Sequence, residues 1–241
     1  MMDLATSAQA VKTEIKSLKF NYKMNTEEIK KQEKIWKNIF PRLKFDRQEI
    51  MAFLAQIKNQ PGQTEILIAP KITAIAPDYY QAVTKILKCH GRARKNFHNY
   101  KTKKLNADYL FLKPRSQKIL KKISHRFRGD FIVLIIQGGR KYAGYSPAQV
   151  DKMLAPNEFG LEIFYGTCYL LIHPETIKSQ KDLAFNLPGN IFTPVAHGQP
   201  HKTLYYQMLF KNNLELGTYW QGFGSPAFGS LTAYYLKEYE K

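Results

Sequence analysis

The chain has 241 residues, of which 44% are hydrophobic and 13% are aromatic, and its formal net charge is +18 at pH 7. This length can bury a substantial core, and this hydrophobic content excludes a disordered tail. So positive a charge favours polyanionic partners: nucleic acid, an acidic membrane or protein surface, or phosphorylated ligands. Two cysteines and the lack of a long apolar run predict a cytoplasmic protein without a secretory signal or transmembrane segment.

The N-terminal part of the chain is predicted to be mainly helical. Residues 1–24 are polar and predict an arm or a loose helix, and apolar side chains recur at helical spacing over 25–40 and 46–57. Ile66–Ala69 and Ile72–Ala76 are predicted as two short strands. A further helix is expected after the capping residue Asp78, and the helices supply core-forming faces.

The basic residues are concentrated in one segment. Between residues 85 and 128 there are fifteen Lys or Arg and a single acid, Asp108, which leaves +4 of the net charge for the rest of the chain. Residues 109–112 are predicted as a strand, and Ser116 is expected to cap a helix with basic residues on its outer side. Residues 91–104 are predicted as a flexible loop, so the basic surface is expected to be fixed to the fold on both sides.

This segment is predicted to track phosphates, because Lys and Arg neutralise phosphates and release counterions while aromatic rings stack on unpaired bases. RNA, alone or in a ribonucleoprotein assembly, is favoured over duplex DNA, since no helix-turn-helix or zinc-finger spacing is present. The alternative is a solvated basic face without a ligand. The residues predicted to bind nucleic acid are Lys88, Arg92, Arg94, Lys95, Phe97, Tyr100, Lys101, Lys103, Lys104, Arg115, Lys118, Lys121, Lys122, Arg126, Arg128, Arg140 and Lys141.

Phe131–Ile136 is an unbroken apolar run bounded by turn residues, which predicts a strand buried on both faces. The glycine pair after it leads into Arg140 and Lys141, which are expected to extend the positive surface. The sequence here matches neither a Walker A loop nor a dinucleotide fingerprint.

The C-terminal part is predicted to begin with two helices, over 147–154 and 161–172, and to continue as β-structure. Leu183–Leu187 is predicted as a strand that ends in a turn at 188–190, and residues 204–220 as a hairpin. The fold expected for 25–241 is therefore a single α+β domain. Its N-terminal helical half would pack on a mixed, largely antiparallel sheet with a buried central strand at 131–136 and a C-terminal hairpin, and it could subdivide near 125–130 into 25–128 and 129–241.

The sequence gives weaker evidence for a metal site or a reactive thiol than for a basic surface. Cys89, His90 and His98 lack a fourth ligand nearby, and the His197–His201 pair lacks helical spacing, so neither a metal nor another cofactor is expected. Cys168 lies in an apolar stripe and is predicted to be a structural thiol.

Two alternatives to nucleic-acid binding stay open. One is an enzyme acting on a phosphorylated or polyanionic substrate, with the work done by Glu158, Glu162, His173, Glu175 or Asp182; these are more simply interpreted as surface residues. The other is a structural or interaction module that docks on an acidic protein or membrane surface. The sequence identifies no reaction, oligomeric state or specific ligand.

Overall fold

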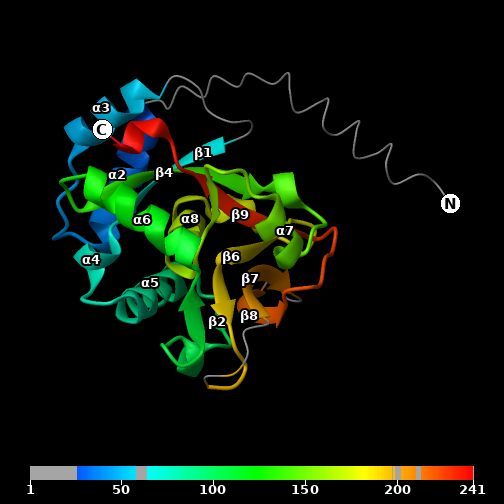
Figure 1. Cartoon of the computed structure of the whole chain (residues 1–241). Helices are drawn as coiled ribbons and strands as arrows, with labels where there is room; N and C mark the ends of the chain where they lie inside the picture. Colours follow the sequence, from blue (N-terminus) through cyan, green and yellow to red (C-terminus); the bar gives the residue numbers. More distant parts are fainter. Residues whose placement is uncertain (1–25, 58–63, 197, 199–201, 210–212, 241) are drawn as a thin grey trace.

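The computed structural model describes residues 26–57, 64–196, 198, 202–209 and 213–240 (Figure 1). The strands are β1 Thr64–Pro70, β2 Phe97–Asn99, β3 Leu110–Leu112, β4 Phe131–Gly139, β5 Glu158–Gly160, β6 Ala184–Phe192, β7 Lys202–Leu209, β8 Asn213–Trp220 and β9 Phe228–Tyr234. The α-helices are α2 Thr26–Ile39, α3 Arg47–Gln56, α4 Ile72–Ile75, α5 Tyr79–Ala93, α6 Pro114–Arg126, α7 Pro147–Met153 and α8 Ile163–Ile172. Short 3₁₀ helices are η1 Thr102–Lys104, η2 Arg140–Tyr142, η3 Pro174–Thr176 and η5 Lys237–Glu240.

All nine described strands belong to one mixed sheet, which confirms the α+β prediction. The strand order is β1-β4-β9-β6-β7-β8-β2, with β3 added to β6 and β5 added to β9. Within the described part of the chain, the β6–β9 and β2–β8 pairs are parallel and the other pairs antiparallel. The predicted hairpin is the antiparallel pair β7–β8, and its turn lies outside the described residues.

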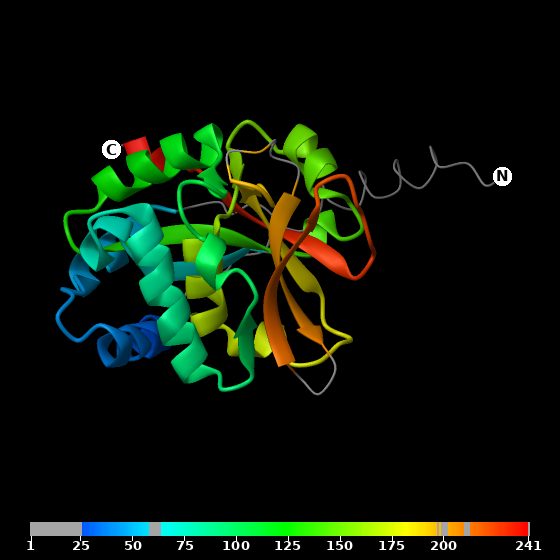
Figure 2. The same cartoon turned by 90° about the horizontal axis from the view of Figure 1, so that it is seen from below.

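The predicted buried strand is β4, an interior strand that pairs with β1 on one side and β9 on the other. Each residue from Phe131 to Ile136 is at most 3% exposed. Figure 2 shows why: α6 lies on one side of β4 and β9, and α5 and α8 lie on the other. Every residue of α8 is buried, so this helix lies wholly within the core.

The helix boundaries follow the capping signals of the sequence. Asp46, Asp78 and Ser146 each accept a hydrogen bond from the backbone amide three residues later, at the starts of α3, α5 and α7. Ser146 and Gln149 form the complete reciprocal capping box. The predicted polar arm over 1–24 lies outside the described residues.

Two local predictions are wrong: one segment is too short to distinguish helix from strand, and one side chain makes a tertiary contact in place of the expected local one. Residues 72–75 form the short helix α4 rather than a strand, since so short and mainly apolar a run fits either state. Helix α6 begins at Pro114, and Ser116 does not cap it: its hydroxyl is buried and donates to the carbonyl oxygen of Gly160, 2.8 Å away. That bond fixes α6 to β5.

The structure also differs from the turn predicted at 188–190 and from the flexible loop predicted at 91–104. Strand β6 continues through 188–190 to Phe192 with an irregular register against β7, because the Gly189 amide donates to Leu161 and the Gly189 carbonyl accepts from Lys113. In the second segment, Phe97–Asn99 pairs as β2 with β8, and η1 follows. Strands from both sides of 125–130 therefore join the same sheet.

Gly160 and Gly189 lie where β5 crosses the irregular part of β6, so close that no side chain fits. A Cβ on Gly160 would lie 2.6 Å from the Gly189 amide nitrogen, and backbone atoms cannot move aside cheaply. Gly160→Ala should therefore lower the free energy of unfolding by about 2–3 kcal/mol, measured by urea denaturation. Gly91→Ala is the control: its Cβ would meet only the Phe97 ring at 3.7 Å, and α5 should gain about 0.5–1 kcal/mol. Equal effects at the two sites would refute this account.

Candidate nucleic-acid interface

Helix α6 carries five Lys or Arg residues, and its sequence determines which way they point. Leu120 and Ile123 are buried at helical spacing, and Ser116 anchors the same side to β5. Most of the charged positions face away from that side, and Lys118, Lys121 and Lys122 are exposed. The amphipathic pattern therefore places the lysines on the side of α6 that faces away from the sheet, as predicted.

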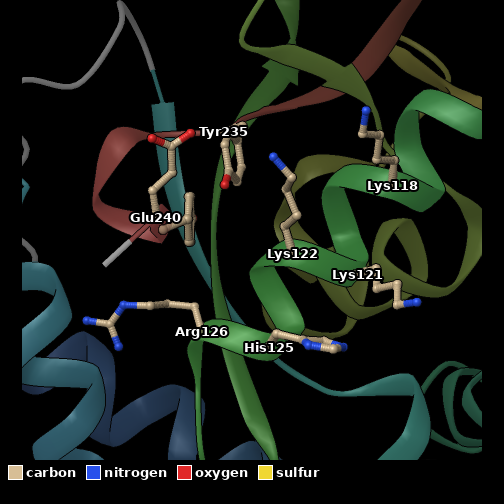
Figure 3. A pocket seen from close by; sticks show the side chains of 8 residues that line it. Lys118, Lys121, Lys122, His125, Arg126, Tyr235 and Glu240 are labelled. Atoms are coloured by element: carbon tan, nitrogen blue, oxygen red, sulfur yellow. The ribbon is translucent and has the colours of Figure 1, made fainter.

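These side chains line a groove of about 630 Å³ between α6 and η5, which is called the α6 groove here (Figure 3). The Lys122 ammonium lies 5.4 Å from the centre of the Tyr235 ring, which stacks on Tyr239. Arg126 donates to the Glu238 carbonyl oxygen and lies over the Phe53 ring. The residues that line the α6 groove are Lys118, Lys121, Lys122, His125, Arg126, Tyr235, Tyr239 and Glu240.

The positive charge of residues 85–128 is not neutralised within the described part of the chain. Of its fifteen cations, Lys113 alone forms an ion pair there, with Asp151. Several others donate to backbone carbonyl oxygens, which carry no net charge; these are Lys85, Arg94, Lys104, Arg115 and Arg126. A surface whose cations lack carboxylate partners keeps its field, as phosphate binding requires.

The predicted site residues do not form one surface, and the two main groups lie apart in both Figure 1 and Figure 2. One region is the α6 groove. The other surrounds β2 and η1, where Lys101, Lys103 and Lys104 line a separate pocket together with Lys202 of β7. Lys202 was not predicted, because it lies about a hundred residues downstream and only strand pairing brings it to the pocket. His125 was also missed, although it lies one turn after Lys121 and Lys122 on the same helix.

Two predicted site residues make contacts within the fold. The half-buried Phe97 ring packs against His90 and Tyr206, with ring centres 4.6 and 6.1 Å away. Arg94 is half-buried and donates to the Ile177 carbonyl oxygen. By contrast, Tyr100 is 65% exposed. Among the other predicted cations, Lys88, Arg92, Lys95, Arg115 and Arg128 are exposed.

Arg140 and Lys141 follow β4 on η2 and line neither of these two pockets. Lys141 instead reaches the carboxylate of Glu158, with 2.6 Å between Nζ and Oε2. Arg140 is exposed beside a cleft that also contains Glu65 and Glu175. These two cations therefore add nothing to the α6 groove.

The carboxylates expected at the surface include two that are completely buried, which corrects that interpretation. Glu158 accepts hydrogen bonds from Lys141, Tyr142 and Thr232. Glu162 caps α8 and accepts from Tyr79 and from the amides of Phe164 and Tyr165; burial outweighs these bonds and raises its pKa to about 7. Both groups belong to core networks.

The remaining residues of the enzyme alternative gather at the cleft beside Arg140. His173 Nδ1 lies 3.3 Å from Glu175, and the Tyr169 hydroxyl donates to Glu65 over 2.8 Å. Asp182, which also lines the cleft, accepts from the amides of Lys178 and Ser179. Nothing in this arrangement specifies a substrate.

The described cysteines and histidines form neither a reactive thiol site nor a metal site. Burial raises the pKa of both Cys89 and Cys168, which disfavours the thiolate. Among the described residues, no three His, Cys, Asp or Glu side chains are grouped so that they could hold a metal ion. His197 and His201 lie outside the described residues.

Comparison with protein families, with curated proteins and with solved structures finds no match to this chain. Of the helices that the structure describes, none has the length and apolar character needed to span a membrane.

Proposed function

We propose that this protein binds single-stranded nucleic acid, RNA in preference to duplex DNA, and that the α6 groove contacts the phosphates. The observation that carries the proposal is the set of exposed α6 lysines that have no described carboxylate partner and share one groove with two tyrosines. Lysines supply sequence-independent phosphate contacts, and a half-exposed ring such as Tyr235 supplies a surface for a base.

The surroundings of α6 favour a single strand over a duplex. In helix-turn-helix proteins the recognition helix is preceded by another helix, which crosses the DNA backbone. Here α6 is preceded by strand β3 and followed by strand β4. Its C-terminal half also lies against η5, so that the open space is a groove beside the helix and not a free helix surface.

The test is a salt series with a fluorescent single-stranded RNA, a single-stranded DNA and a duplex. Replacing Lys118, Lys121 and Lys122 together by Gln should reduce the slope of log affinity against log salt by about 2, since each lost contact contributes about 0.7. Affinity for the RNA should fall about tenfold or more at moderate salt. The lysines are exposed, so the fold should be unaffected.

The matched control removes the same charge from another helix. Lys30, Lys31 and Lys34 lie on α2, away from the groove, and their replacement by Gln lowers the net charge equally. This variant should change the affinity by less than about threefold. Equal losses in the two variants would mean that the overall charge, and not the α6 groove, attracts the nucleic acid. Absence of salt-dependent binding by the unmodified protein would refute the proposed function.

A further inference from the structure

A second cationic site lies at the other basic region, and we infer that it holds the terminal phosphomonoester of a nucleic-acid strand. It is called the lysine pocket here. The inference deepens the proposed function and rests on it for the identity of the ligand. The residues that line the pocket, of about 350 Å³, are Asn99, Tyr100, Lys101, Thr102, Lys103, Lys104, Phe192, Pro194, Lys202 and Thr218.

The composition of the lysine pocket indicates a strongly anionic ligand. Four of its lining residues are lysines, and no described lining residue is a carboxylate. The uncharged side chains of Asn99, Thr102 and Thr218 add hydrogen-bonding groups beside the ammonium groups. Two lysines are held in place: Lys101 lies 5.6 Å from the centre of the Phe192 ring, and Lys104 donates to the Pro194 carbonyl oxygen over 2.8 Å.

The ammonium groups lie close enough to repel one another. Burial lowers the pKa of Lys101, and repulsion from Lys202 and Lys104 lowers it further. The nearby carboxylate of Glu215 acts in the opposite direction, but it already accepts a hydrogen bond from Tyr205 over 2.6 Å. A bound anion would relieve this repulsion, which persists because Lys101 and Lys104 lie at the two ends of η1 and Lys202 is held beside them on β7.

A phosphomonoester suits the pocket better than an internal phosphodiester. At neutral pH it carries between 1.5 and 2 negative charges and three acceptor oxygens, whereas a diester carries a single charge. The pocket offers more cations than one diester would neutralise. The α6 groove, in contrast, has the larger volume, about 630 Å³, and suits successive diesters.

Exposed aromatic rings beside the lysine pocket indicate where a terminal base would lie. Tyr100 lines the pocket, is 65% exposed and stacks on His98. Trp220 is 62% exposed and is the cross-strand partner of Lys202, so the two side chains emerge on the same face of the β7–β8 hairpin. A phosphate among the lysines would leave its nucleoside within the region between these rings.

The test compares otherwise identical short RNAs with a phosphate or a hydroxyl at the 5′ end, and a second pair that differs at the 3′ end. One phosphorylated end should bind about tenfold more tightly than its hydroxyl counterpart. This ratio should rise from pH 5 to pH 7 as the monoester gains its second charge, with a pKa of about 6. Equal affinities within both pairs would overturn the inference while leaving the proposed function intact.

Variants then assign the effect to the pocket. Replacing Lys101 and Lys202 by Gln should abolish the preference for the phosphorylated end while RNAs with hydroxyl ends keep their affinity within about threefold. Replacing the exposed Lys178 and Lys181 by Gln removes equal charge and should preserve the preference. A preference that survives loss of Lys101 and Lys202 would overturn the assignment.

A third measurement separates this inference from the proposed function. Isothermal titration of the unmodified protein with 5′-UMP and with uridine requires no RNA binding. Saturable binding of 5′-UMP that Lys101→Gln/Lys202→Gln removes, with none for uridine, supports the pocket even if the α6 groove binds no RNA. If neither compound binds and neither RNA pair discriminates, the lysine pocket is not a phosphomonoester site.

Discussion

Replacing His90 by Leu should make the protein markedly more resistant to acid. The imidazole is 1% exposed between Phe97 and Tyr206, and neither ring nitrogen has a hydrogen-bond partner among the described residues. Burial, assisted by the positive charge of Arg94, lowers the pKa of His90 to about 3. An imidazole in the unfolded chain takes up a proton near pH 6.5, so protons favour the unfolded state below that pH.

The size of the effect follows from the two pKa values. As pH falls from 6.5 towards 3, the wild-type protein should lose about 1.4 kcal/mol of unfolding free energy per pH unit through this one group. Urea denaturation should therefore show His90→Leu gaining about 3 kcal/mol more at pH 4 than at pH 7.5, relative to wild type. His98→Leu changes an exposed ring in the same region and serves as the control. Parallel pH curves for His90→Leu and wild type would contradict the assignment.

Removing Lys141 should destabilise the fold, although its position after β4 had suggested a ligand-binding role. Its ammonium is the cationic partner of Glu158, whose carboxylate is fully buried. Burial lowers the pKa of Lys141, but the bond to Glu158 outweighs burial and raises it above the usual value. Lys141→Met would leave an uncompensated buried carboxylate, which should cost about 3 kcal/mol of unfolding free energy, measured by urea denaturation.

A double variant distinguishes a lost charge partner from lost packing. Lys141→Met/Glu158→Gln removes both charges and should recover about half of the loss. Arg140→Met, the exposed neighbour, should change the stability by less than about 0.5 kcal/mol. If the double variant is no more stable than Lys141→Met, charge burial is not the cause. None of these changes should alter the salt slope of RNA binding, because these residues do not line the α6 groove.

The sequence predicted the elements that depend on local patterns. Helix starts at Asp46, Asp78 and Ser146, and the fully buried run of β4, are fixed by neighbours within a few residues. The sequence-based predictions failed where contacts between distant segments determine whether a residue is buried. Glu162 looks like a surface acid in its own helix, but it is buried because Tyr79 and the start of α8 surround it.

The same distinction applies to the candidate site. The charge density of residues 85–128 and the outward lysines of α6 were predicted correctly, because both are properties of one continuous segment. The division of that segment into two regions was not, since it depends on β2 pairing with β8 and on α6 being fixed to β5. The role of Lys202 depends likewise on a hairpin far along the chain.

Strand β9 has a consequence for how this protein is made. It is the last strand in chain order, but it lies between β4 and β6 and hydrogen-bonds to both. Before the ribosome has released residues 228–234, the β1–β4 pair and the β6–β7–β8 ribbon each present an open edge to the other and to neighbouring chains. Sheet closure must therefore wait for β9, and nascent chains stalled upstream of β9 should be the aggregation-prone species.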